Sequence, residues 1–542
     1  MTSSSTEDAS SGESVAYEAI IVAADFGTTF SGVAWAQASN PDSHYIINQW
    51  PHDDSGSCYG PSSEKVPSEV AYEYNKTGPK CRWGFQIPHI MPRIQWIKLG
   101  LAPNEKLGIG SRLSASYSDC RRAPVPHHTS CEEVMLENRI GSSFNSKTLE
   151  YVITVPAIWP EKAKMATLSC AKKAGCCETS KMRIVSEPEA AAIHTLRAKS
   201  PHGLKVGDTI VVCDAGGGTV DLITFSIGRL VPNLHLKEEV PGNGALCGGS
   251  FLNRRFEEFL TGRLSNVPGW DRDTLDEAMQ RFETVAKRSF SGNADDDIMF
   301  PVPGIADNEQ LGVRRGRLRV SGCEMKELFQ PVLEEVHDLV QRQIQSVYLR
   351  QYLEKSVFPR IEVLAPVDGW TAVVRGALAK TIGDVSDTAI KASVDSRKAR
   401  ENYGLIDSTK FISEVHDEKK KYWDYFEGEY HIDVMNWLIR KGDDIKEAEA
   451  IKTEWRRHQL VKRGAFDSIH VTLYKLDTPM GEKPPLYFNR HSRYRLPECR
   501  GADGKLYYII DYAIHASYYS AHCEYELWYE GRNHGSVKAD YV

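Results

Sequence analysis

The chain has 542 residues, of which 41% are hydrophobic and 26% are charged, which is typical of a globular protein with several structural units. It has 66 Lys and Arg residues against 73 Asp and Glu residues, and the resulting net charge of −7 excludes a globally basic nucleic-acid-binding protein. No apolar run is long enough for a membrane-spanning helix, so we expect no membrane association. The Ser-rich, acidic N-terminus lacks the apolar core of a signal peptide, and 12 scattered cysteines fit reduced thiols. These features predict a cytoplasmic protein, with the nucleus as the alternative compartment.

The first half of the chain alternates short apolar runs with helical patterns. Residues 1–17 are predicted to be a disordered tail. Apolar runs at 20–24 and 31–36 predict two strands that flank a Gly- and Thr-rich turn. Residues 101–147 have no clear period and are predicted to form an irregular insert. A strand at 151–155, a helix after Pro160, a strand at 183–185 and a helix at 189–196 follow.

The second half begins with the same pattern of a strand, a turn and a return strand. Strands are predicted at 209–213 and 220–227, and helices at 251–264, 273–290 and 324–347. The charged stretch 416–429 is predicted to be part of a connector. From about Ile432, alternating segments rich in aromatic residues predict a separate, mostly β unit.

Two turns carry the chemistry of the chain. Each begins with an aspartate at the end of a buried strand: Asp25-Phe-Gly-Thr-Thr29 and Asp214-Ala-Gly-Gly-Gly-Thr219. Glycines let backbone N–H groups converge on a phosphate, and threonine hydroxyls add donors. An aspartate at such a position can hold a magnesium ion through its waters. Each turn alone could be an ordinary β-hairpin, but the pair predicts a site that holds a nucleotide's phosphates from two sides.

With these turns, the chain resembles the 70-kDa heat-shock chaperone family of the actin-like ATPase superfamily, over roughly residues 19–382. Further matching segments occur in the family's order: Ile153–Ala157, Ser186–Ala192, Cys247–Phe251, Glu283–Arg288, Pro366–Asp368 and Ala372–Ala377. The resemblance implies an α/β, actin-like ATPase fold of two lobes with a nucleotide cleft, plus a small β-rich C-terminal domain. The implied boundaries are a tail at 1–17, lobe I at 18–205, lobe II with a return to lobe I at 206–385, a connector at 386–431, and a β-rich domain at 432–542 that resembles a lid-less substrate-binding sandwich.

The resemblance also implies roles for individual residues. The residues expected to hold the phosphates are Gly27, Thr28, Thr29, Gly216, Gly217 and Gly218. Gly248 and Gly249 are expected to approach the nucleotide, with Lys287 and Arg288 flanking the adenosine. The catalytic residues are expected to be Lys98, Glu187, Asp214 and Thr219. Asp25 and Asp214 are expected to organise magnesium through its waters, and Asp221 to support the second hairpin.

The activity that this resemblance implies is slow hydrolysis of ATP to ADP and phosphate, with ATP/ADP and Mg²⁺ as cofactors. Nucleotide state would switch the closure of the lobes, as in a stress-response chaperone. The implied partners are unfolded client polypeptides and co-chaperones. The sequence does not determine the oligomeric state.

One departure from the family pattern concerns the adenosine site. The family has a Gly-Gly turn just before the segment aligned with Tyr348, whereas here residues 336–348 fit one continuous helical stripe. We also expect no long helical lid after the C-terminal strands. The alternatives are therefore a pseudo-ATPase interaction scaffold that has lost adenosine binding and, third, a small-molecule kinase of the same superfamily.

Overall fold

The structure is a computed structural model that divides into two compact units. The first comprises Met1–Leu234 and Gly242–Ser393, and the second comprises His235–Pro241 and Val394–Val542. The described residues are 19–41, 43–52, 62–75, 78–88, 91–101, 148–176, 181–198, 203–355, 363–386, 391–447, 449–460, 474–476, 498–500, 502–518, 523–529 and 532–537. The predicted tail and all of the predicted insert except Leu101 lie outside these residues.

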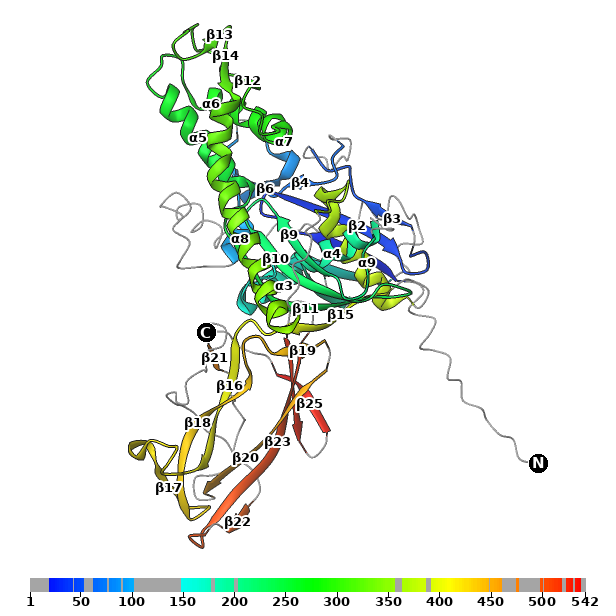
Figure 1. Cartoon of the computed structure of the whole chain (residues 1–542), viewed down its shortest axis with the longest axis vertical. Coiled ribbons are helices and arrows are strands. Elements are labelled where there is room, and N and C mark those ends of the chain that lie inside the picture. The colour runs from blue at the N-terminus through cyan, green and yellow to red at the C-terminus, as the bar shows by residue number, and fades with distance from the viewer. Residues whose placement is uncertain are drawn as a thin grey trace, which may run out of the picture. The chain divides into compact units, whose positions relative to one another are not determined.

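The first unit contains a sheet in the order β3-β2-β1-β7-β8. Its strands β2 and β3 are labelled in Figure 1. β1 (Ile20–Asp25) pairs antiparallel with β2 (Phe30–Gln37) and parallel with β7 (Leu149–Val155), which pairs parallel with β8 (Lys181–Ser186). β3 (His44–Ile46) and β4 (Val66–Pro67) both pair with β2. β5 (Val70–Asn75) and β6 (Gly78–Trp83) form a separate hairpin.

Both faces of this sheet are covered, which explains why β1 is a continuous apolar run. Ile21 and Ala23 of β1 pack with side chains of α9 (Ala372–Val385), whereas Ile20 and Val22 pack on the other face. α9 also packs on α4 (Glu187–Ala198). α3 (Glu161–Ala171) follows β7, as the sequence predicts.

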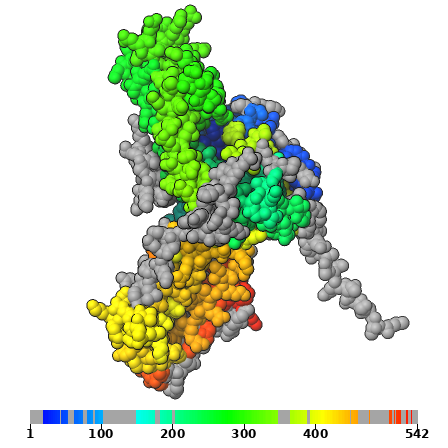
Figure 2. All heavy atoms as spheres, in the orientation of Figure 1, coloured from blue at the N-terminus to red at the C-terminus, as the bar shows by residue number. Residues whose placement is uncertain are grey.

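The second predicted hairpin consists of β9 (Thr209–Ala215) and β10 (Val220–Arg229), which pair antiparallel. β11 (Leu234–Ala245) follows and contributes residues to both units. A helical region then packs around the small sheet β12-β14-β13, and its green residues form one continuous block in Figure 2. Its elements are α5 (Gly249–Leu264), α6 (Arg272–Arg281), α7 (Lys287–Ser289), β12 (Asp297–Pro301), β13 (Val313–Arg314) and β14 (Arg317–Ser321).

Helix α8 runs without interruption from Gly322 to Lys355 (Figure 1). Its Leu339 packs with Val220 and Leu222 of β10. The sequence predicts a continuous helix over this segment, and the structure confirms it. None of the described helices is both long and apolar enough to cross a membrane.

The second unit is built almost entirely of strands among the residues described. One sheet has the order β17-β18-β16-β21, and another has the order β20-β23-β24-β25 with β22 added to β23. β15 (Ala392–Lys398) begins in the first unit and continues into the second. The other strands are β16 (Asn402–Lys410), β17 (Tyr422–Asp424), β18 (Glu429–Ile439), β19 (Asp444–Lys446), β20 (Ile451–Leu460), β21 (Tyr474–Leu476), β22 (Glu498–Arg500), β23 (Leu506–Tyr518), β24 (Cys523–Tyr529) and β25 (Arg532–Val537). Residues 386–431, predicted as a connector, contain β15, β16 and β17.

The predicted mixed α/β architecture is confirmed, because both units are assembled from several sheets and the first also contains long helices. The arrangement in two lobes around a cleft stays a prediction.

Candidate functional site

The first predicted turn connects β1 to β2 and has little room for side chains. Asp25 lies at the end of β1 opposite Gly32 of β2. A Cβ on Gly27 would lie 2.1 Å from the carbonyl oxygen of Phe30, so this turn accepts only glycine at that position. Thr28 and Thr29 follow at its tip, with Thr28 buried.

The second turn connects β9 to β10 in the same manner, with Asp214 paired directly opposite Asp221. Gly216 N–H donates to the carbonyl of Thr219 at 3.0 Å and closes the turn. A Cβ on Gly217 would lie 2.2 Å from Oγ1 of Thr29, and one on Gly218 would lie 2.7 Å from Oγ1 of Thr28. The structure therefore brings the two predicted hairpins together, tip to tip.

The start of α5 lies against the second turn. Gly249 N–H donates to the carbonyl of Gly216 at 2.9 Å, and Ser250 N–H donates to that of Gly217 at 2.7 Å. A Cβ on Gly248 would lie 2.6 Å from the carbonyl oxygens of Gly216 and Gly217, so only glycine allows this approach. The predicted pair Gly248 and Gly249 is thus part of the same site.

The predicted catalytic pair, Lys98 and Glu187, forms a buried ion pair. Nζ of Lys98 donates to Oε1 of Glu187 at 2.5 Å, and the two residues are only 3% and 7% exposed. Burial, together with the nearby carboxylates Asp25 and Asp214, raises the pKa of Glu187 to about 7, although Lys98 acts in the opposite direction. Burial lowers the pKa of Lys98, but its carboxylate neighbours outweigh this effect and hold the pKa above its ordinary value.

Asp25 has two partners that sequence reasoning missed as site residues. Nζ of Lys65 lies 2.7 Å from Oδ2 of Asp25, and the Thr154 hydroxyl donates to Oδ1 at 3.0 Å. Burial raises the pKa of Asp25, but Lys65 and Lys98 more than compensate and keep it below its ordinary value. Thr154 could have been found, because it continues the strand that pairs with β1. Lys65 lies far from any Gly-rich turn in the sequence, which offers no signal for it.

The two aspartates of the second hairpin carry raised pKa values. Burial and repulsion from Asp221 and Asp25 raise the pKa of Asp214 to about 7. Burial and repulsion from Glu187 raise the pKa of Asp221 to about 6, against hydrogen bonds from Thr219 and the Ile158 N–H. Such values indicate an excess of negative charge that a cation would relieve.

The donor set can be compared with what magnesium requires. Carboxylate oxygens suit this hard cation, which keeps several of its waters. No protein donor to the Asp214 carboxylate is found among the described residues, so this carboxylate fits a hydrated magnesium ion. Asp25 fits less well, since Lys65 and Thr154 already engage its two oxygens. No cluster of three or more metal-ligating side chains occurs in the described part of the chain.

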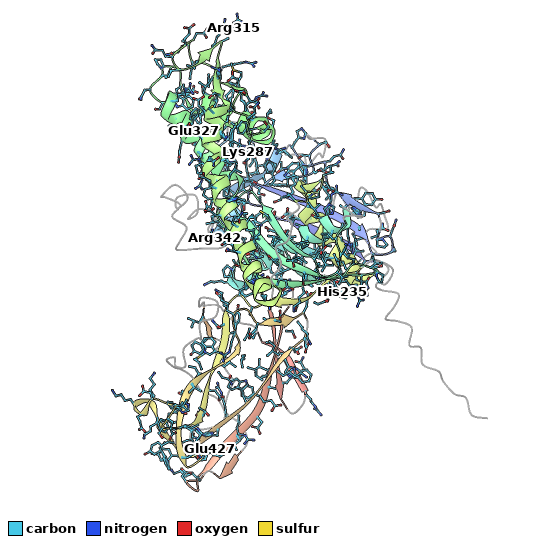
Figure 3. The ribbon with its side chains drawn as sticks, viewed as in Figure 1. His235, Lys287, Arg315, Glu327, Arg342 and Glu427 are labelled. Atoms are coloured by element: carbon cyan, nitrogen blue, oxygen red, sulfur yellow. The ribbon has the colours of Figure 1, made fainter. Side chains whose placement is uncertain are left out.

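Lys287 and Arg288, predicted to flank the adenosine, lie on α7 next to these segments. Nζ of Lys287, labelled in Figure 3, pairs with Glu283 at 2.6 Å and lies 3.5 Å from where a Cβ on Gly249 would be. Arg288 places its guanidinium 5.0 Å from the ring centre of the half-exposed Trp370.

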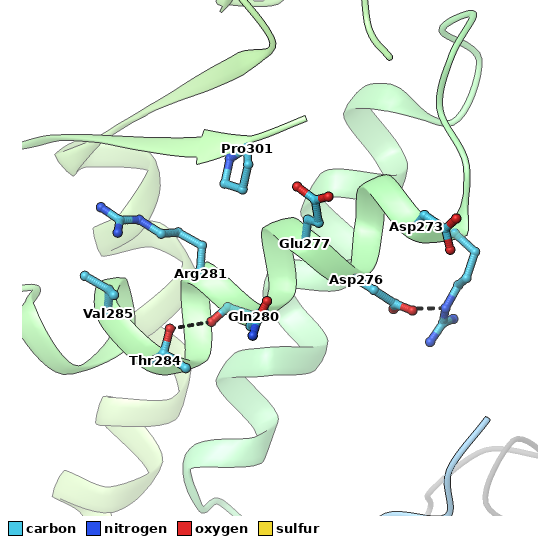
Figure 4. Close-up of a pocket in the computed structure, with 9 residues that line it drawn as sticks. Asp273, Asp276, Glu277, Gln280, Arg281, Thr284, Val285 and Pro301 are labelled. Carbon is cyan, nitrogen blue, oxygen red and sulfur yellow. Dashed lines mark hydrogen bonds and ion pairs between the residues drawn. The ribbon is translucent and has the colours of Figure 1, made fainter. Parts of the chain in front are cut away.

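A surface hollow lies away from these hairpins, on α6 and the π-helical turn that follows it (Figure 4). Asp276, Glu277 and Arg281 line it together with Pro301 of β12. Its lining includes none of the predicted site residues.

Comparison with known proteins shows two family matches and several distant relatives. A family model described as Hsp70 protein matches residues 134–352, and one described as a domain of unknown function (DUF8568) matches residues 397–467. The chain is 26% identical to heat shock 70 kDa protein 12A of human and of mouse over 309 residues, which cover 44% of this chain and 45% of the relative. It is 24% identical over 306 residues to human heat shock 70 kDa protein 12B, covering 44% of each.

The mixed α/β fold of the chain is consistent with the actin-like ATPase fold. The match over residues 134–352 and the distant similarity to the 12A proteins support a divergent relative of the 70-kDa heat-shock proteins. The matched region spans less than half the length of these relatives.

Proposed function

We propose that the chain is a nucleotide-binding protein that hydrolyses ATP slowly and uses the nucleotide as a conformational switch. The observation that carries the proposal is the meeting of two aspartate-ended, glycine-rich hairpins beside a buried lysine–glutamate pair. Because the two tips are in contact, a chain of phosphates between them requires the hairpins to separate. Binding would therefore change the angle between the segments that carry the two hairpins.

Each side chain has a role in this proposal. Backbone N–H groups of the Gly216–Gly218 turn and the hydroxyls of Thr28 and Thr29 would hold phosphate oxygens. Lys98 would stabilise the transferring phosphoryl group, and Glu187 would orient the attacking water once its carboxyl group is ionised. Asp214 would hold the waters of a magnesium ion, which supplies neutralising charge to the phosphates when bound.

Calorimetric titration of the full chain with Mg-ATP and Mg-ADP tests this function. We expect binding that Asp214→Ala weakens, and slow phosphate release that Lys98→Met abolishes. Asp511→Asn, which removes an exposed pair with Arg456, is the matched control and should change neither. Cooperative unfolding shows that the chain is folded. If such a folded chain binds neither Mg-ATP nor Mg-ADP, the proposal is refuted.

A second candidate is an interaction scaffold that no longer binds adenosine. The uninterrupted course of α8 from Gly322 to Lys355 favours it, since the Gly-Gly turn expected by resemblance near residue 347 is replaced by helix. Such a scaffold would bind inorganic triphosphate as well as ATP, because only the phosphate hairpins would contribute. Equal affinities for the two ligands would support this candidate over the ATPase.

The strand-rich second unit is the part of the chain for which we propose contact with client polypeptides. Support comes from the similarity of residues 134–352 to Hsp70 proteins and from the two antiparallel sheets of this unit. Trp423, Tyr425 and Tyr430 are exposed on β17, the turn after it and β18. A fluorescent unfolded peptide whose affinity changes between ATP and ADP would support this role, whereas no binding in either state would contradict it.

A further inference from the structure

Lys65 is a buried cation that the proposed mechanism does not use, although it contacts the first hairpin's aspartate. We propose that Lys65 is a built-in counter-ion of the phosphate site, which takes over part of the charge neutralisation that a divalent metal would supply. Nucleotide phosphates would then bind with only weak dependence on magnesium. This inference rests on the proposed nucleotide binding and deepens it.

The chain holds Lys65 in place from several sides. β4 pairs with β2, with Ser31 opposite Val66, and Ser68 N–H donates to the carbonyl of Thr29 at 2.8 Å. The segment that carries Lys65 is thereby fixed directly beside the first phosphate turn. Lys65 is only 7% exposed, so its ammonium group is not an ordinary surface charge.

Gly32 provides the path by which Lys65 reaches Asp25. A Cβ on Gly32 would lie 3.2 Å from Cγ and 3.4 Å from Cε of Lys65. The lysine stem thus passes over the glycine that pairs with Asp25 across the hairpin. A larger residue at this position would push the stem away from the carboxylate.

The charges around Lys65 explain why a fixed cation is needed. Asp25, Glu187, Asp214 and Asp221 come from four segments of the first unit, and Lys65 and Lys98 are the lysines that face them. Lys98 is engaged by Glu187, so Lys65 is the cation at Asp25. An ammonium group binds phosphate as a compact point charge, and its three donors can serve Asp25 and a phosphate oxygen at once.

An ion pair that only stabilises the fold would have a different signature. In that case Lys65→Met would lower the stability and leave the metal dependence of binding unchanged. The decisive quantity is therefore the ratio of the dissociation constants for ADP measured in excess EDTA and in excess Mg²⁺.

The ratio is measured by calorimetry on the full wild-type chain, Lys65→Met, Lys65→Arg and Lys164→Met, a control lysine paired with Glu161 on α3. We expect a ratio below about 10 for the wild type, Lys65→Arg and Lys164→Met, and above about 100 for Lys65→Met. Thermal unfolding of each variant shows whether it is folded. If Lys65→Met does not fold, the ratios of the wild type and of Lys65→Arg, which keeps the positive charge, still test the proposal.

A wild-type ratio above about 10 would overturn the role of Lys65 and leave the proposed function standing. The same holds if Lys65→Met keeps the wild-type ratio. If ADP binds the folded wild type under neither condition, both proposals fail.

Discussion

The buried pair Lys98–Glu187 allows a quantitative prediction about stability, because its two members have unequal surroundings. Lys98 faces three carboxylates, Glu187, Asp25 and Asp221, whereas Glu187 has Lys98 as its lysine partner. Lys98→Met leaves Glu187 and Asp221 without their lysine, whereas Asp25 keeps Lys65. Glu187→Gln removes a carboxylate from a site with excess negative charge and leaves Lys98 with Asp25 and Asp221. We therefore expect Lys98→Met to cost about 3–5 kcal/mol at pH 8, and Glu187→Gln about 1 kcal/mol.

The pH dependence follows from the pKa of Glu187, which is raised from 4.5 to about 7. Between these values the folded chain binds a proton that the unfolded chain has released, so the free energy of unfolding falls as the pH rises. The span corresponds to about 3 kcal/mol for this group. Protonation also removes part of the charge that Lys98 balances, so the cost of Lys98→Met should shrink by about 2 kcal/mol at pH 5.5.

Urea unfolding followed by tryptophan fluorescence at pH 5.5 and 8 measures these differences. Arg272→Met is the control, since the exposed Arg272 pairs with Asp276 on the surface of α6 and its loss should cost less than about 1 kcal/mol at both pH values. Equal costs for Lys98→Met and Glu187→Gln, or a cost of Lys98→Met that does not change with pH, would refute the reasoning.

Three further predictions concern catalysis and packing. With the pKa of Glu187 at about 7, the hydrolysis rate should rise roughly tenfold from pH 6 to pH 8 if the ionised carboxylate orients water, and a flat profile would contradict this role. Gly376→Ala should destabilise the chain by about 1–3 kcal/mol, because the new Cβ would lie 1.7 Å from the carbonyl oxygen of Ala190. Gly262→Ala, which adds a Cβ in open space on α5, should instead stabilise the chain by about 0.5–1 kcal/mol. Calorimetric unfolding measures both changes. In the second unit, Glu238→Gln should cost about 1–3 kcal/mol, because the fully buried Glu238 lies 2.5 Å from Arg400, and an unfolding midpoint like that of the wild type would contradict this.

The elements around the site could be predicted because each has a local signal. The strands that enclose the two turns and the helices α4, α5 and α8 follow from apolar periodicity and from glycine placement, and the structure confirms them. The short strands β3, β4 and β12 to β14 could not be predicted, because they consist of two to five residues and owe their existence to pairing with neighbours.

The site residues also divide into those with a local sequence signal and those whose role depends on neighbouring strands. Those on the hairpins were recognisable because the turns require glycine and threonine at fixed positions, and Lys98 and Glu187 were found through the family resemblance. Lys65 and Thr154 were missed as site residues since their roles depend on which strands lie beside β1 and β2. Cross-strand neighbours are not visible in a single sequence.

The two halves of a nucleotide site place different demands on a sequence, and this difference separates the two candidate functions. A phosphate hairpin is a local structure, so Gly27 and Gly217 preserve it as long as the turns keep their length. An adenosine-binding surface, by contrast, is assembled from segments that are distant in the sequence. Here one of these segments is part of helix α8. A second, Arg288, lies against the ring of Trp370. If Trp370 supplies a stacking surface for the base, Trp370→Ala should weaken ADP binding roughly 5- to 150-fold and leave triphosphate binding unchanged. Equal effects on the two ligands would place Trp370 outside the base site and favour the scaffold.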